Sequence, residues 1–238
     1  MTDESAFEVG RNLAVTRGAV VFENDLIQLI QYSPLVETVS EYPLLIVPPC
    51  INKYYVLDMQ PENSFVRYAL EQGNNVFIIS WRNIPPGLGT LTWDDYLEQG
   101  VIQAINVSLA VAGVKKLNAL GFCVGGTLLA CALAVMRSKR RNPAASLTLL
   151  STMLDFTDTG EISVYIDSAY VQKIKAEIGT GGLVPGRDLA LTFASLRANE
   201  LVWFYVVNNY LKGKTPHAFD LLYWNSDSAN LPGPMYVY

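Results

Sequence analysis

Short apolar runs alternate along the chain with longer stretches in which apolar residues recur at helical spacing. Some of the short runs are rich in β-branched residues, and others are apolar without a break, as strands buried on both faces of a sheet are. The predicted strands span residues 18–22, 26–32, 44–47, 76–79, 117–122 and 147–150. The first two flank the turn-forming residues 23–25 and predict a hairpin. Strands that alternate with helical stretches predict an α/β protein.

Three stretches between these strands predict helices. They span residues 63–72, 93–111 and 125–137. Thr92 precedes the second helix and is a favourable N-cap residue. Asp94 and Asp95 stand near the positive end of that helix dipole, where carboxylates are stabilised, so we interpret them as structural residues.

The pattern changes near residue 156. Residues 161–178 and 188–211 have helical spacing, a glycine-rich loop at 179–186 divides them, and no strand is predicted in this region. This organisation predicts a sheet-based core over residues 1–155 and a helical cap over residues 156–238. No closing element is predicted at the end of the chain.

Composition excludes several classes of function. The chain has 238 residues, of which 17 are Lys or Arg and 22 are Asp or Glu, giving a formal net charge of −5. The longest basic run is the short stretch 137–141, so no nucleic-acid partner is expected. The single histidine, His217, excludes a histidine-rich metal site. The longest strongly apolar run, residues 201–207, falls well short of the roughly 17 residues that a transmembrane helix needs.

The cysteines and the N-terminus predict a cytoplasmic protein. Cys50, Cys123 and Cys131 are an odd number in a chain long enough to bury a core, which favours reduced thiols over a disulfide framework. The first eight residues are acidic and lack the basic and apolar regions of a secretory signal.

One motif carries chemistry. Residues 121–126, GFCVGG, fit the G-x-[S/C]-x-G pattern of a nucleophile elbow and lie between a predicted buried strand and a predicted helix. Gly121 and Gly125 suit a strained turn, and the helix N-terminus at Cys123 favours the thiolate. The alternative is a buried structural cysteine. Cys131, eight residues further along the same helix, fits that alternative, and we assign it to the core.

An elbow of this kind needs two backbone N–H donors for the oxyanion. Val124 supplies the first donor, because the elbow motif uses the N–H of the residue directly after the nucleophile. The second comes from the loop after the strand at 44–47, and because prolines have no N–H, either Cys50 or Ile51 donates. The alternative is an ordinary turn stiffened by Pro48 and Pro49.

The order nucleophile, acid, base leaves His217 as the one histidine available for a triad with Cys123. The acid candidates between them are Asp155, Asp158, Asp167 and Asp188. Asp155 is favoured because it follows a predicted sheet strand. His217 follows a cap helix rather than a sheet strand, so an exposed loop histidine is the better interpretation.

The sequence resembles the class I/II poly(3-hydroxyalkanoate) synthases, which polymerise bacterial storage polyesters. The resemblance is carried by PLLIVPPCINKYYVLDMQPENSFVRYALEQG at 43–73, VFIISWRN at 76–83, GFCVGG at 121–126, STMLDF at 151–156 and FDLLYWNSDSANLPGPMY at 219–236. It implies an α/β-hydrolase fold with a helical cap insertion. It also implies that this chain is an internal piece of a longer synthase, whose last sheet strands lie beyond Tyr238.

The same resemblance implies roles for individual residues. Cys123 would be the acyl-accepting nucleophile, with Val124 and Ile51 as the oxyanion donors. Trp224 and Asp227 lie in the family's WNxD segment and would contribute near the cap and active site, although packing and loop capping are an equally good interpretation.

The family's catalytic Asp and His would also lie beyond Tyr238, which leaves His217 without a catalytic role. The isolated chain is therefore expected to turn over little or no substrate.

The chemistry implied is transfer of (R)-3-hydroxyacyl groups from coenzyme A thioesters to a growing polyester, with no metal or redox cofactor. The implied partners are the acyl-CoA substrate, the polymer with its cytoplasmic granule surface, and a second copy of the chain in a homodimer. Two alternatives are another α/β-hydrolase enzyme with a cysteine nucleophile, such as a thioesterase or lactone hydrolase, and a binding domain without catalysis.

Overall fold

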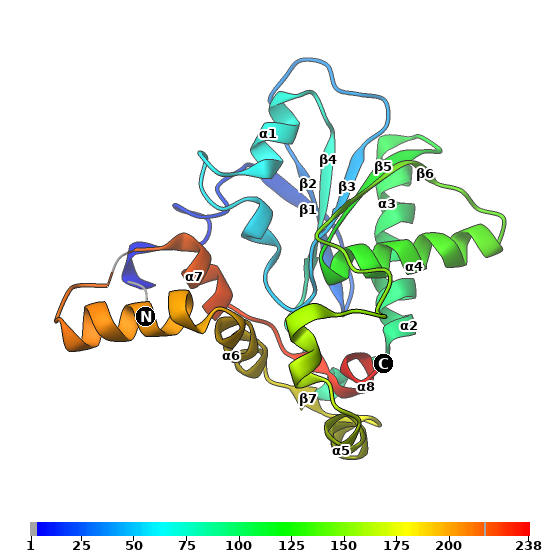
Figure 1. Ribbon diagram of the computed structural model, residues 1–238. Helices are drawn as coiled ribbons and strands as arrows, with labels where there is room; N and C mark the ends of the chain where they lie inside the picture. Colours follow the sequence, from blue (N-terminus) through cyan, green and yellow to red (C-terminus); the bar gives the residue numbers. More distant parts are fainter. Residues whose placement is uncertain (1–3, 217) are drawn as a thin grey trace.

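A computed structural model describes residues 4–216 and 218–238, and within them the chain forms a six-stranded sheet in the order β1-β2-β4-β3-β5-β6 (Figure 1). The strands are β1 (Gly18–Glu23), β2 (Ile27–Tyr32), β3 (Leu44–Val47), β4 (Val76–Trp81), β5 (Leu117–Phe122) and β6 (Ala144–Leu150). The predicted hairpin is confirmed, since β1 and β2 pair antiparallel. β2 also runs antiparallel to β4, whereas β3, β4, β5 and β6 are mutually parallel.

The continuously apolar strands are the central ones. β3 lies between β4 and β5, and its residues Leu45, Ile46 and Val47 are fully buried. Strands buried on both faces need apolar side chains on both faces, which is why the runs at 44–47 and 76–79 show no polar alternation.

Helices cover both faces of the sheet (Figure 1). On one face, α1 (Phe65–Glu71) packs against alternate strand residues that include Ile46 and Ile78. On the other face lie α3 (Gln103–Ala112) and α4 (Val124–Ser138), which bury Leu45, Phe77 and their neighbours. This sandwich of helices around a mostly parallel sheet confirms the predicted α/β core.

The predicted helix at 93–111 is continuous but not uniform. It comprises α2 (Trp93–Asp95), a π-helical segment η4 (Tyr96–Ile102) and then α3. Thr92 caps it as predicted: the Asp95 N–H donates to the Thr92 hydroxyl at 3.3 Å, and the Thr92 N–H donates to the Asp95 carboxylate at 2.8 Å.

The prediction that no strand follows residue 156 is wrong. β7 (Leu183–Val184) pairs antiparallel with β8 (Leu231–Pro232). Two-residue strands carry no period in the sequence, and their partners are far apart in the chain, so neither could be found from spacing.

The predicted cap helices are also shorter than expected. Within 161–178, helix α5 covers Ser168–Ile178 and begins at the N-cap Asp167. Within 188–211, α6 (Gly186–Leu196) is followed by the π-helical segments η6 (Asn199–Trp203) and η7 (Val206–Leu211).

The chain end also departs from the prediction, because α7 (Asp220–Ser226), β8 and α8 (Gly233–Tyr236) form where no closing element was predicted. In Figure 1, α5, α6 and α8 lie at one end of the sheet, away from α1. The remaining short helical turns are η1 (Glu4–Ala6), η2 (Tyr54–Leu57), η3 (Pro86–Leu88) and η5 (Gly160–Tyr165).

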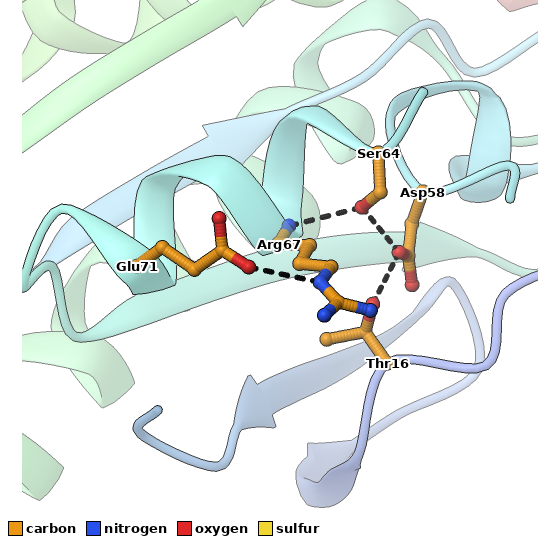
Figure 2. A network of polar contacts seen from close by, with 5 residues as sticks. All are labelled: Thr16, Asp58, Ser64, Arg67 and Glu71. Carbon is orange, nitrogen blue, oxygen red and sulfur yellow. Dashed lines mark hydrogen bonds and ion pairs between the residues drawn. The ribbon is translucent and has the colours of Figure 1, made fainter. Parts of the chain in front are cut away.

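A buried carboxylate ties the N-terminal segment to the core (Figure 2). Asp58 is 2% exposed and accepts hydrogen bonds from the hydroxyls of Thr16 at 2.5 Å, Ser64 at 2.6 Å and Tyr32 at 3.3 Å. Burial raises the pKa of Tyr32, and the carboxylate raises it further, so the phenol stays protonated and donates. Ser64 also caps α1 by accepting from the Arg67 N–H at 2.9 Å.

Replacing Asp58 with Ala should lower the free energy of unfolding by about 3 kcal/mol, because buried hydroxyls would lose a charged acceptor. Urea unfolding followed by circular dichroism measures the change. Glu71→Ala is the matched control, since it removes a half-exposed ion pair with Arg67 on the same helix and should cost under about 0.5 kcal/mol. Equal effects of the two substitutions would contradict a stabilising role for the Asp58 network.

Candidate active site

Cys123 occupies a strained turn between β5 and α4. Its backbone has φ 54° and ψ −132°, in the positive-φ region that non-glycine residues rarely adopt. The Cys123 N–H donates to the Leu150 carbonyl at 2.9 Å, and the Cys123 carbonyl accepts from the Gly126 N–H at 2.9 Å. A strained residue held by its surroundings at the start of a helix is typical of a functional site.

The glycines of the motif allow close backbone contacts on both sides of the turn. A Cβ at Gly121 would overlap the Gly126 Cα, and a Cβ at Gly125 would overlap the carbonyl oxygens of Val47 and Pro48. The start of α4 therefore rests directly on the end of β3. The spacing of the motif is explained by these contacts rather than by turn propensity alone.

The loop after β3 lies beside the turn. Val47 pairs with Gly121 in the parallel ladder, so the loops after β3 and β5 leave the same edge of the sheet. Burial raises the pKa of the Cys50 thiol to about 12, with a smaller contribution in the same direction from Cys123. The buried Cys50 thiol therefore stays protonated.

The four acid candidates are engaged in local contacts, none of which involves Cys123. Backbone hydrogen bonding from Thr157 lowers the pKa of Asp155, a fully exposed carboxylate that caps its own turn. The other three accept from or pair with the neighbours Gly160 (Asp158, 2.9 Å), Tyr170 (Asp167, 2.8 Å) and Arg187 (Asp188, 3.5 Å). His217 lies outside the described residues, so the triad candidate from chain order stays untested.

Cys131 lies on α4 and packs, partly buried, against the main hydrophobic cluster, as its assignment to the core predicts.

Trp224 and Asp227 contact the loop after β3 rather than Cys123 itself. The Trp224 indole N–H donates to the Lys53 carbonyl at 2.8 Å, and the Tyr55 hydroxyl donates to Asp227 at 2.8 Å. The Ala229 N–H donates to the Ile51 carbonyl at 3.0 Å. We call residues 224–230 the strap, because their hydrogen bonds hold this loop.

A cavity of about 540 Å³ opens beside these contacts and is lined in part by Lys53, Tyr55, Arg82 and Asp227.

Sequence reasoning missed Tyr55, Asp58 and Asn52. All three are buried, although Asn and Asp are polar and Tyr carries a hydroxyl. They fall in segment 43–73, one of the segments that carry the family resemblance, and the polar residue types in that segment were the available signal. Their partners could not be identified, because Tyr55 and Asp227 are 172 positions apart.

Within residues 4–216 and 218–238, no group of three or more His, Cys, Asp or Glu side chains could hold a metal ion. Over the same ranges, no helix is both long and apolar enough to cross a membrane.

Two family sequence models match the chain. One, described as the poly-beta-hydroxybutyrate polymerase (PhaC) N-terminus, matches residues 1–69. The other, described as the alpha/beta hydrolase fold, matches residues 43–237.

Curated relatives align along the chain. The poly(3-hydroxyalkanoate) polymerase subunit PhaC of Cupriavidus necator is 57% identical, and the alignment covers 100% of this chain and 41% of that protein. The corresponding subunit of Rhizobium meliloti is 44% identical over 97% of this chain and 38% of that protein. This chain spans about two fifths of the length of these relatives.

A solved structure of a candidate lipase from Sulfolobus solfataricus matches with a TM-score of 0.54 at 15% identity, covering 93% of this chain and 79% of that one. This likeness shows the fold.

Replacing Gly125 with Ala should destabilise the chain by about 1–3 kcal/mol, because the added methyl group would force α4 away from Val47 and Pro48. Thermal or urea unfolding measures the loss. Gly87→Ala is the control, since nothing lies within 4 Å of its added Cβ. A Gly125→Ala chain as stable as the control would show that the close contact is unnecessary.

Brief treatment of the native chain with iodoacetamide should modify Cys123 well before Cys50, which is 2% exposed and kept protonated. Peptide mass spectrometry reports the site of modification. In urea, both cysteines should react. Native labelling of Cys50 as fast as Cys123 would contradict the buried, neutral thiol.

Proposed function

The chain belongs to the alpha/beta hydrolase fold family, and because its sequence is related along its length to poly(3-hydroxyalkanoate) polymerases, we propose that it takes part in polyester synthesis from (R)-3-hydroxyacyl-CoA, with Cys123 as the acyl-accepting nucleophile. The observation that carries the proposal is the strained cysteine between β5 and α4. The structure supports a nucleophile there because the turn presents Cys123 at the N-terminus of a 15-residue helix.

In the proposed step, the Cys123 thiolate attacks the thioester carbonyl carbon and forms a new C–S bond. The tetrahedral oxyanion then collapses, the bond to coenzyme A breaks, and the departing thiolate takes up a proton. A base accepts the proton of the Cys123 thiol beforehand and later that of the incoming hydroxyl. The acid and base are, in this proposal, residues of the polymerase outside the present sequence.

Two backbone donors would stabilise the oxyanion. Val124 is the first residue of α4, and the N–H of a helix's first residue has no acceptor in a preceding turn of that helix. Ile51 is in the loop that leaves β3 beside the elbow, and we assign it the second donor. Close contact between Gly125 and the end of β3 supports a fixed separation of the two donors.

Cysteine suits polymerisation better than serine. Transfer from a coenzyme A thioester to an enzyme thioester exchanges one thioester for another and is nearly isoenergetic. The acyl group therefore remains activated for attack by the hydroxyl of the next monomer or of the growing chain. No metal or redox cofactor enters the proposed reaction.

The cap offers an apolar surface for the partners of the reaction. Trp203, Phe204, Tyr210 and Leu211 are all more than half exposed on η6 and η7 or between them. Patches of this kind mark interaction sites. We propose that this surface meets the polymer, its cytoplasmic granule or a second subunit in a homodimer.

Replacing Cys123 with Ala should abolish acyl-enzyme formation, because no other residue in the proposal accepts the acyl group. Intact-mass spectrometry of a polymerase that carries this sequence, after incubation with (R)-3-hydroxybutyryl-CoA, measures the adduct. Cys131→Ala is the matched control on the same helix and should leave acylation unchanged, as should His217→Ala. An adduct on the Cys123→Ala chain would contradict the assignment.

Product analysis tests the reaction class in a polymerase that carries this sequence. Coenzyme A release together with polymer supports the proposal. Release with free 3-hydroxy acid as the only product would contradict it and indicate a thioesterase.

A further inference from the structure

The loop that carries the proposed donor Ile51 is held chiefly by the strap. The Nδ2 atom of the buried residue Asn52 has no hydrogen-bond partner within the described residues, so this atom does not anchor the loop. Hydrogen bonds to the strap join Ile51, Lys53 and Tyr55 to residues more than 170 positions further along the chain.

Hydrogen bonds anchor the chain on both sides of the proposed donor, Ile51. On its N-terminal side, the Trp81 indole N–H donates to the Pro48 carbonyl at 2.8 Å. On its C-terminal side, the Ile51 carbonyl accepts from Ala229, and Asn52 forms a bridge with Ser228. The direction of an N–H depends on the peptide planes around it, so anchors on both sides restrict where the Ile51 N–H points.

Two side chains of the strap extend this hold. Trp224 donates to the Lys53 carbonyl, and Asp227 accepts from the Tyr55 hydroxyl. Burial raises the pKa of Tyr55, with a further rise from its hydrogen bond to Asp227, so the phenol remains a donor. A hydrogen bond from a buried phenol to a carboxylate is stronger than one between neutral groups.

We propose that Trp224 and Asp227 are positioning residues that hold the segment 51–55 so that the Ile51 N–H can stabilise the oxyanion at Cys123. The proposal rests on the proposed function, since it assumes that Cys123 accepts an acyl group. It assigns Asp227 no proton transfer. Its carboxylate acts through Tyr55, and cap and oxyanion hole are thereby coupled.

Loss of this positioning should affect acylation of Cys123 and not its alkylation. Acylation of Cys123 by a thioester passes through an oxyanion and needs the donor in place. Alkylation by iodoacetamide displaces iodide in a single step, creates no oxyanion and needs only the thiolate. A variant that disturbs the donor alone slows acylation and leaves alkylation unchanged, whereas a variant that disturbs the whole site changes both.

The test compares these two rates at Cys123 in a polymerase that carries this sequence, by mass spectrometry, with (R)-3-hydroxybutyryl-CoA and with iodoacetamide. Tyr55→Phe removes one donor and keeps the ring, whereas Trp224→Phe removes one donor and keeps a smaller aromatic side chain. Each should slow acylation by at least about 10-fold, as a small misplacement of a catalytic group does, with the alkylation rate unchanged.

Two substitutions of Asp227 distinguish a positioning role from a role for its charge. Asp227→Asn keeps a carbonyl oxygen for the Tyr55 hydroxyl and should stay within about 3-fold of wild type, since it retains a neutral hydrogen bond. Asp227→Leu removes the acceptor and should behave like Tyr55→Phe. Equal losses in the Asn and Leu variants would overturn positioning and indicate a role for the charge.

Asp220→Asn is the matched control. Asp220 begins the same helix, α7, and accepts from Gln60 and Asn63 at 2.9 Å, so it joins cap to core without contacting residues 51–55. Neither rate should change in this variant.

Acylation at wild-type rates in both Trp224→Phe and Tyr55→Phe, or equal slowing of both reactions, overturns the positioning role and leaves the nucleophile assignment intact. A wild-type polymerase carrying this sequence that is alkylated at Cys123 but never acylated overturns both proposals. If Trp224→Phe loses its circular dichroism signal, Tyr55→Phe decides.

Discussion

The turn at Cys123 depends on close contacts between backbone segments, and a side chain at these positions would prevent the contacts. Gly125 lies against the carbonyl oxygens at the end of β3, and Gly121 lies against Gly126. These contacts bring α4 onto the sheet edge and support a cysteine backbone with φ 54°, a conformation that costs on the order of 1–3 kcal/mol. The neighbouring parallel strands β3 and β5 then deliver the loop with Cys50 and the thiol of Cys123 to one place.

The two halves of the proposed oxyanion hole differ in how they are built. Val124 is placed by the helix that starts at the nucleophile, so its geometry is local in sequence. The loop with Ile51 leaves a different strand and is anchored by Trp224 on α7 and by Asp227 and Ala229 directly after it. In our proposal, the second donor is fixed only when this part of the chain is in place.

The strands and the elbow could be predicted because they are periodic or local. Continuous apolar runs identified β3 and β4, and Thr92 was predicted as an N-cap because it directly precedes a helical pattern. The β7–β8 pair and the Asp58 network were not predictable, because each joins residues distant in sequence without a repeating pattern. The roles of Cys123, Val124 and Ile51 remain predictions, as does the division at residue 155.

The central claim is that Cys123 carries the acyl group as a thioester. The direct measurement is the chemistry of the trapped intermediate. A polymerase that carries this sequence is treated with radiolabelled (R)-3-hydroxybutyryl-CoA and digested, and the labelled peptide is exposed to neutral hydroxylamine. A thioester at Cys123 predicts label on the peptide containing GFCVGG and its release by hydroxylamine. Label on another peptide, or an adduct that hydroxylamine leaves intact, would contradict the account.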